Sequence, residues 1–175
     1  MEQESGKIDS TASGGADIVV DTLAMLPQHL WQKYEINTGP YGKDSNLHKF
    51  KVPIPSTKSC SLAAEGNYDS LSKLPANELD VPDEHGNSAI IYAANNGHHE
   101  VVKFLITHEG VDLNRRGYLG NTALSRAARA GHIEIVRTLL TDGKSNPDIP
   151  NDKWQYPLHF AAFKKKPEVV DALIA

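Results

Sequence analysis

The chain has 175 residues and a formal net charge of −4, with 39% hydrophobic and 23% charged residues. This length accommodates one domain with a hydrophobic core and is short for two large ones. The acidic balance argues against a general affinity for nucleic acid or anionic membranes, because both attract proteins with a basic face. Cys60 is the single cysteine, so no intramolecular disulfide can form, which favours a reducing compartment.

The first 17 residues are rich in Gly, Ser and Asp and offer little apolar surface, so we expect them to be disordered. They lack the apolar core of a secretory signal and are too acidic for a transit peptide. No apolar run reaches the ~18 residues of a membrane span, and we expect no membrane insertion. We therefore expect a cytoplasmic protein, with a nuclear or a processed organellar form left open.

An apolar island follows within residues 18–60, a segment that we expect to form an extended arm with one short helix. The apolar spacing over 18–26 is compatible with a helix that Pro27 ends or interrupts, and later prolines and glycines impose turns. The island either packs on the domain's own first repeat or docks on a partner through Trp31 and Tyr34, since large aromatic residues dominate interface energetics. Simple disorder is a third interpretation.

From about residue 60 the sequence repeats itself every 34 residues (127 − 93 and 161 − 127). The pair Ala93–Ala94 recurs as Ala127–Ala128 and again as Ala161–Ala162. Other positions share this register: Val101–Val102, Ile135–Val136 and Val169–Val170; Leu105, Leu139 and Leu173; Gly86 and Gly120; Asp80, Asn114 and Asp148. A period of this size indicates stacked units of supersecondary structure, each of which covers an apolar face of its neighbour.

Each unit predicts two helices joined by a tight turn. The inner helix begins near Ser88, Thr122 or Tyr156, where Ser and Thr can cap exposed amide groups. Its paired alanines allow neighbouring helices to approach closely. Gly97 or Gly131 ends the inner helix at a position where a left-handed residue costs least. An outer helix follows, with one apolar stripe and outward-facing Lys or Arg.

These units resemble the ankyrin repeat, whose signature includes T-P-L-H-x-A at a period of about 33 residues. Three segments carry the resemblance: AIIYAANNGHHEVVKFLI, TALSRAARAGHIEIVRTLL and PLHFAAFKKKPEVVDALI. The resemblance implies an all-α solenoid of paired antiparallel helices with β-hairpin-like turns over residues 61–175. We expect a degenerate first repeat at 61–79, followed by repeats at about 80–113, 114–147 and 148–175, the last of them truncated.

The last unit departs from the pattern at several positions. Trp154 and Lys165 replace the two glycines, and Pro167 stands at the expected start of the outer helix, where proline is tolerated. This unit alone carries the signature histidine, His159. The sequence ends at Ala175 within the expected outer helix, so we expect either a truncated array or a face that a partner covers.

The sequence contains no motif that predicts catalysis, a cofactor or a metal ion. His98, His99 and Glu100 are adjacent, but neighbouring helical residues point in different directions, and H-E-x-x-H is absent. Cys60, at the edge of the linker, belongs to no recognisable nucleophile motif. The glycines of 117–121 lack the Lys and Ser/Thr of a phosphate loop. We expect neither an enzyme in its own right nor a small-molecule substrate.

The resemblance instead implies a protein-interaction module: an adaptor, a scaffold or an accessory subunit of a larger complex. Ankyrin-like stacks meet protein partners at the tips of their turns and on the concave face of their inner helices. By register, the tip residues are Glu84, His85, Tyr118, Leu119, Asp152, Lys153 and Trp154. The inner-helix residues are Tyr92, Asn95, Asn96, Arg126, Arg129, Phe160, Phe163 and Lys164.

Among these residues we expect Tyr118, Leu119 and Trp154 to matter most, unless they pack sideways on neighbouring turns. A solvated helix end explains the basic run 164–166 best, ahead of contact with an acidic partner or, more remotely, nucleic acid. An alternative function is the recruiting or regulatory segment of a longer enzyme, for example a signalling or ubiquitin-pathway protein. A further domain in the parent sequence would distinguish that alternative.

Overall fold

The structure, a computed structural model, describes residues 52–142 and 145–175. This part of the chain contains helices and no strand. The helices are α3 (Lys58–Glu65), α4 (Tyr68–Leu71), α5 (Ala89–Asn96), α6 (His99–Ile106), α7 (Ala123–Ala130), α8 (Ile133–Thr141), α9 (Pro157–Phe163) and α10 (Pro167–Ile174), with short 3-10 turns η3 (Ala76–Glu78) and η4 (Tyr118–Gly120). The tail and most of the arm predicted above, including Trp31 and Tyr34, lie outside the described residues.

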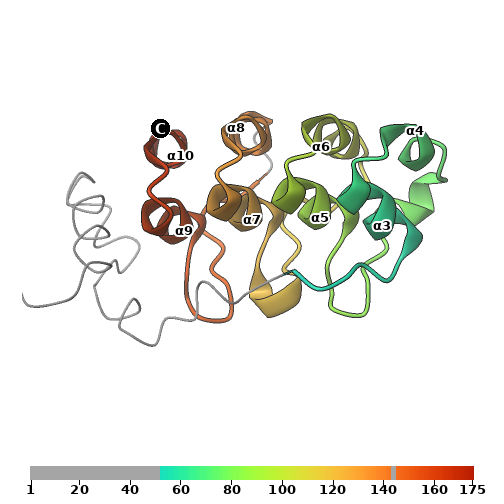
Figure 1. Cartoon of the computed structure of the whole chain (residues 1–175), viewed down its shortest axis with the longest axis horizontal. Coiled ribbons are helices and arrows are strands. Elements are labelled where there is room, and N and C mark those ends of the chain that lie inside the picture. The colour runs from blue at the N-terminus through green and yellow to red at the C-terminus, as the bar shows by residue number, and fades with distance from the viewer. Residues whose placement is uncertain (1–51, 143–144) are drawn as a thin grey trace, which may run out of the picture. The chain divides into compact units, whose positions relative to one another are not determined.

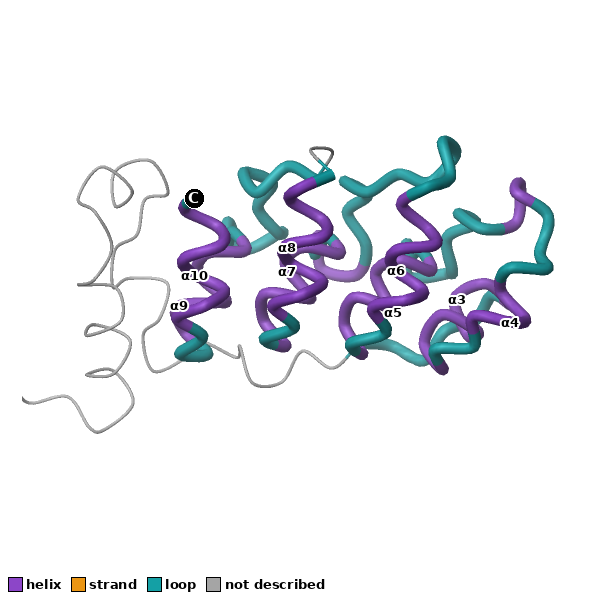
Figure 2. Tube along the Cα trace, turned by 90° about the horizontal axis from the view of Figure 1, so that it is seen from above, coloured by secondary structure: helices purple, strands orange, loops and turns teal. Residues whose placement is uncertain are grey.

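The helices form two layers. The inner helices α3, α5, α7 and α9 lie in one row and the outer helices α4, α6, α8 and α10 in a second, with the connecting turns projecting beyond the inner row (Figure 1). Seen from above, the helix pairs follow one another in chain order (Figure 2). Each inner helix contacts the next, α3 with α5, α5 with α7 and α7 with α9. The predicted all-α solenoid of paired helices is confirmed.

Small side chains hold the inner layer together. Three alanines, Ala93, Ala127 and Ala161, are fully buried between neighbouring inner helices. The helices approach closely at these positions because an alanine side chain ends at Cβ. The outer helices add the buried residues Val101, Val102, Leu105, Ile135, Val136, Leu139, Val169 and Val170. Each unit buries its apolar stripe against the next one, so the residues that recur every 34 positions in the sequence are the buried residues of the core.

The turns between repeats are hairpin-like, although they contain no strand. A backbone hydrogen bond between residues four apart spans each of them. The bonds run from the N–H of Asp83 to the carbonyl of Asn87, from Gly117 to Asn121 and from Asn151 to Gln155, at 2.8, 3.0 and 2.9 Å. Each turn leads directly into an inner helix. Thr122 caps one of these helices by accepting from the N–H of Ser125 at 3.2 Å, whereas Ser88 makes no such side-chain bond.

Polar side chains tie together successive loops that connect an outer helix to the next inner helix. The carboxylate of Asp80 accepts from the N–H of Asp112 at 3.2 Å, and one period later the Asn114 amide oxygen accepts from the N–H of Asn146 at 2.7 Å. These bonds explain why Asp or Asn recurs at this register. A backbone amide of the following loop would otherwise lack this acceptor.

The histidines that follow the helix-ending glycines make a second set of ties. Nε2 of His98 lies 2.9 Å from the carbonyl oxygen of Ala64, and Nε2 of His132 lies 3.2 Å from that of Asn95. A carbonyl oxygen only accepts, so each imidazole donates its Nε2 proton to the preceding repeat. Lys166 occupies the corresponding place in the last repeat, against Gly131.

The last repeat keeps the left-handed backbone of the others although it lacks their glycines. Trp154 and Lys165 have φ of 60° and 53°, close to the 72° of Gly120 and the 83° of Gly131 one period earlier. A residue with a Cβ in this conformation costs roughly 1–2 kcal/mol, because Cβ approaches the following carbonyl oxygen. The stacking of the repeats therefore dictates the backbone here, against local preference.

We expect Lys165→Gly to raise the free energy of unfolding by about 0.5–1 kcal/mol, the relief of backbone strain less the extra unfolded-state entropy of glycine. Urea denaturation measures the change. Lys73→Gly is the matched control, because Lys73 is exposed and is not among the residues with positive φ, so glycine there should destabilise. A loss of stability at Lys165 equal to that at Lys73 would contradict the strain argument.

Candidate partner-binding groove

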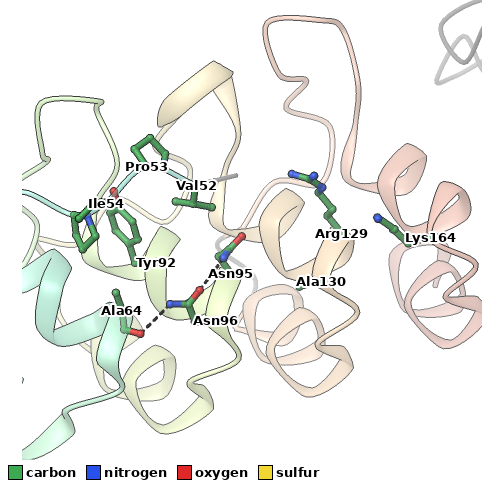
Figure 3. Close-up of a pocket in the computed structure, with 11 residues that line it drawn as sticks. Val52, Pro53, Ile54, Ala64, Tyr92, Asn95, Asn96, Arg129, Ala130 and Lys164 are labelled. Atoms are coloured by element: carbon green, nitrogen blue, oxygen red, sulfur yellow. Dashed lines mark hydrogen bonds between the residues drawn. The ribbon is translucent and has the colours of Figure 1, made fainter. Parts of the chain in front are cut away.

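The exposed side of the inner helices carries a groove of about 580 Å³, which we call the inner groove. Residues from α3, α5 and α7, the residue after α9 and a segment preceding α3 form its lining (Figure 3). The lining residues are Val52, Pro53, Ile54, Pro55, Ala64, Tyr92, Asn95, Asn96, Arg129, Ala130 and Lys164. The groove thus spans all four repeats.

Helix geometry explains which residues reach this face. Residues at i, i+3 and i+4 share one side of an α-helix, so each inner helix presents one triplet to the groove. The triplets are Tyr92, Asn95 and Asn96 on α5; Arg126, Arg129 and Ala130 on α7; and Phe160, Phe163 and Lys164 at α9. Of the predicted inner-helix residues, Asn96 is exposed, and Asn95, Arg129, Phe163 and Lys164 are half-buried.

The first member of each triplet is buried, which corrects the expectation that Tyr92, Arg126 and Phe160 form an exposed surface. They are 2%, 1% and 3% exposed. This position is the one nearest the turn, and for Tyr92 the turn supplies hydrogen-bond partners. The Tyr92 hydroxyl donates to Oδ2 of Asp83 at 2.5 Å and accepts from Nδ2 of Asn87 at 3.2 Å. Burial and the bond to Asp83 raise the pKa of Tyr92 well above its ordinary value.

Arg126 has no such carboxylate. Its Nη2 donates to the carbonyl of Tyr118 at 3.3 Å, while its Nε and Nη1 are buried without a hydrogen-bond partner. Arg126 lacks a carboxylate partner because Gly117 occupies the turn position that Asp83 occupies one period earlier. A side chain at Gly117 would collide with Asn87, whose Oδ1 would be 2.3 Å from the added Cβ. Burial, and then the neighbouring charge of Arg129, lower the pKa of Arg126 to about 10.

The predicted tip residues lie at the ends of the turns. Glu84, His85, Asp152, Lys153 and Trp154 are exposed, whereas Tyr118 and Leu119 are half-buried. The Tyr118 ring packs edge-on against His85 of the preceding turn, with ring centroids 5.8 Å apart. Leu119 accepts from the N–H of Asp152 at 3.1 Å through its carbonyl, at a φ of 58°. Both residues therefore contact neighbouring turns.

Trp154 differs from the other tip residues because it is large, apolar and 76% exposed. It borders a second hollow of about 340 Å³ that includes Ile149, Pro150 and Asn151. An ion pair between Arg116 and Asp152, with Nη2 and Oδ1 2.7 Å apart, lies beside it. The tip of the last turn thus offers an aromatic side chain next to a partly apolar hollow with charged edges.

Sequence reasoning missed the segment Val52–Pro55, which forms a wall of the inner groove (Figure 3). Prolines at 53 and 55 disfavour a helical backbone for the residues before them, which is the signal that this segment is extended. Ser56 fixes its end by accepting from the N–H of Glu84 at 3.3 Å, at the first turn tip. Within the described part of the arm, the chain therefore packs on its own repeats, and Ile54 stays 86% exposed.

Cys60 lies in the core rather than at a linker edge, because α3 begins at Lys58. It is fully buried, and its thiol lies 3.4 Å from the carbonyl oxygen of Asn87. Burial raises the pKa of the Cys60 thiol to about 11, which disfavours the reactive thiolate. Within 52–142 and 145–175, no group of three His, Cys, Asp or Glu side chains could hold a metal ion. In the same residues, no helix has the length and apolar character needed to cross a membrane.

Comparison with known proteins agrees with this geometry. A family model described as ankyrin repeats (3 copies) matches residues 60–151, more than half of the chain. The comparison with curated proteins gave no match. Ankyrin repeats are generally non-catalytic modules for protein–protein interaction, which implies protein partners. The repeat register, the paired helices and the matching family model together show that the chain belongs to the ankyrin-repeat family.

Proposed function

We propose that this chain is a non-catalytic adaptor or accessory subunit that holds a partner protein on the inner groove and the turn tips. Trp154 is the observation that carries the proposal. Large aromatic residues are enriched among the few interface residues that supply most of the binding energy. Trp154 stands at a turn tip, where polar residues are the rule, with three quarters of its surface in water.

Two features of Trp154 make it unfavourable for the isolated chain. Its left-handed backbone carries strain, and its exposed indole leaves apolar area unburied. The equivalent position is glycine in the two preceding repeats, so the repeat architecture does not require a tryptophan there. Burial of the indole against a partner would remove its apolar surface from water and would make Trp154 a binding residue.

We expect Trp154→Ala to weaken binding of the partner by roughly 30-fold or more, the effect of losing about 2 kcal/mol at a hot spot. Affinity capture of the tagged full-length chain from its native extract, with quantitative mass spectrometry, identifies the partner. Titration with that purified partner then gives the change in affinity.

Tyr68→Ala is the matched control, because Tyr68 is an exposed aromatic residue on the outer helix α4. The proposal predicts full binding by this variant. It also predicts that circular dichroism shows intact helices in both variants. Equal partner binding by wild type and Trp154→Ala would contradict a role for the turn tip.

A further inference from the structure

We propose that the inner groove takes an acidic segment of the partner, whose carboxylates bind between Arg129 and Lys164 above the buried charge of Arg126. This inference rests on the proposed partner-binding function and specifies the chemistry of the bound segment.

The charge of the groove is opposite to that of the chain. The chain carries a net charge of −4, yet the charged residues in the described lining of the inner groove are Arg129 and Lys164, with no Asp or Glu. Both side chains line the groove, Arg129 from α7 and Lys164 from the residue after α9 (Figure 3). An acidic segment in the groove can therefore place one carboxylate against each cation.

Arg126 adds a third positive charge on the same face of α7, one helical turn from Arg129. It is 1% exposed, and two of its guanidinium nitrogens lack hydrogen-bond partners. A buried charge of this kind is unfavourable unless a counter-charge lies near it. Tyr92, at the same register one repeat earlier, has Asp83 as its partner, and Arg126 has Gly117 in that place. The chain therefore buries a cation on α7 without the acid that the preceding repeat places at this position of the turn.

Burial changes the pKa values of both arginines, and the closeness of the two guanidinium groups adds to the change at Arg126. Burial and the charge of Arg129 lower the pKa of Arg126, and burial lowers that of Arg129. The shift at Arg126 agrees with its two guanidinium nitrogens that lack hydrogen-bond partners. A bound anion would stabilise the cationic form of each arginine. Charge-assisted hydrogen bonds are roughly twice as strong as neutral ones.

The groove favours a peptide over nucleic acid as the carrier of these carboxylates. The segment Val52–Pro55, whose prolines favour an extended backbone, already lines this face. The side-chain amides of Asn95 and Asn96, which can bond to a peptide backbone, line the same groove. Nucleic acid binding draws on a broad basic surface, whereas this chain carries a net charge of −4.

Fluorescence polarisation with a labelled hexaglutamate peptide and the full-length chain tests the proposal. We expect binding that weakens as salt is raised to about 1 M, where the Debye length falls to about 3 Å. Hexaglutamine should not bind. The double variant Arg129→Gln/Lys164→Gln should bind hexaglutamate at least about tenfold more weakly, because two charge-assisted contacts are lost.

Lys103→Gln/Arg137→Gln is the matched control, since it removes the same two charges from exposed positions on α6 and α8. Equal binding by the two double variants would overturn the proposal, because net charge alone would then explain the affinity. Equal or tighter binding of a single-stranded RNA hexamer would also overturn it, in favour of a phosphate-binding surface.

Arg126→Met tests the buried charge separately. We expect this variant to bind hexaglutamate several-fold more weakly and to melt at a higher temperature than the wild type, since it removes an uncompensated buried cation. A lower melting temperature with unchanged affinity would overturn the role of Arg126 and show that it only supports the turn.

The proposal and the proposed function fail in different ways. A partner whose binding depends on Trp154, together with no binding of hexaglutamate, would leave the adaptor function standing and overturn the acidic-segment inference. Groove-dependent binding of hexaglutamate, without any partner that depends on Trp154, would support the groove chemistry and contradict the proposed function.

Discussion

Acidification is expected to destabilise the folded chain by about 1.4 kcal/mol per pH unit between pH 6.5 and about 4 through His159 alone. Burial lowers the pKa of His159 from 6.5 to about 4 in the folded state. Below pH 6.5 the unfolded chain therefore binds a proton that the folded chain does not. Stability falls as the pH drops through this window, and the contribution reaches its limit, about 3 kcal/mol, when both states are protonated.

The geometry of His159 explains why the neutral form is required. Its side chain is 3% exposed, and its Nδ1 accepts from the N–H of Tyr156 at 2.9 Å. Nδ1 accepts only when it carries no proton, so the ring proton is on Nε2. Protonation of Nδ1 breaks the bond at the start of α9 and places a charge in the core.

Urea denaturation across this pH range measures the slope, and His159→Gln isolates it. Carboxylates also titrate at the acid end, so the quantity to compare is the difference between the two proteins at each pH. His85→Gln is the control, because His85 is exposed at a turn tip and should leave the slope as in the wild type. An identical pH dependence for wild type and His159→Gln would contradict the assignment.

Asp83→Ala is expected to lower the free energy of unfolding by about 3–5 kcal/mol. One carboxylate oxygen of Asp83 accepts from the backbone N–H groups of His85 and Asn87, both at 2.9 Å, and the other accepts from the hydroxyl of Tyr92. The residue is 6% exposed. Each buried donor left without its acceptor costs about 1–3 kcal/mol.

Chemical denaturation of a small series resolves these bonds. Tyr92→Phe removes one bond and should lose less than Asp83→Ala, and Asp83→Asn should recover part of the loss because its amide oxygen still accepts. Asp142→Ala, at the exposed end of α8, is the matched control and should change stability by no more than about 0.5 kcal/mol. A similar small change for Asp83→Ala would show that the turn does not depend on this side chain.

The repeat register was predictable because its physical causes recur along the chain. Alanine pairs, aliphatic stripes and helix-ending glycines each reflect one local requirement, and their 34-residue spacing adds up to a stacked architecture. Gly97 and Gly131 end their helices at φ of 85° and 83°, as expected from their position. Pro167 begins α10 at a place where its missing N–H has no role in the helix.

The exposure of individual side chains was not predictable in the same way. Tyr92 and Arg126 occupy a register that periodicity assigns to the groove, but the turn before each inner helix folds over that position. One turn residue, Asp83 or Gly117, decides whether the turn offers a carboxylate to the buried side chain. Its effect becomes apparent only when the turn packs against the inner helix. The contact of Val52–Pro55 with the inner helices is likewise long-range, and no periodic signal marks it.

The paired alanines also set the distance between neighbouring inner helices across the inner groove. Closely packed helices lie about 8–10 Å apart, and an extended peptide advances about 3.3 Å per residue. A segment that crosses the inner helices thus meets a new repeat with about every third residue. In the proposed complex, carboxylates that reach Arg129 on α7 and Lys164 after α9 therefore stand about three positions apart, so the face would select a spacing of acids along a sequence as well as their charge.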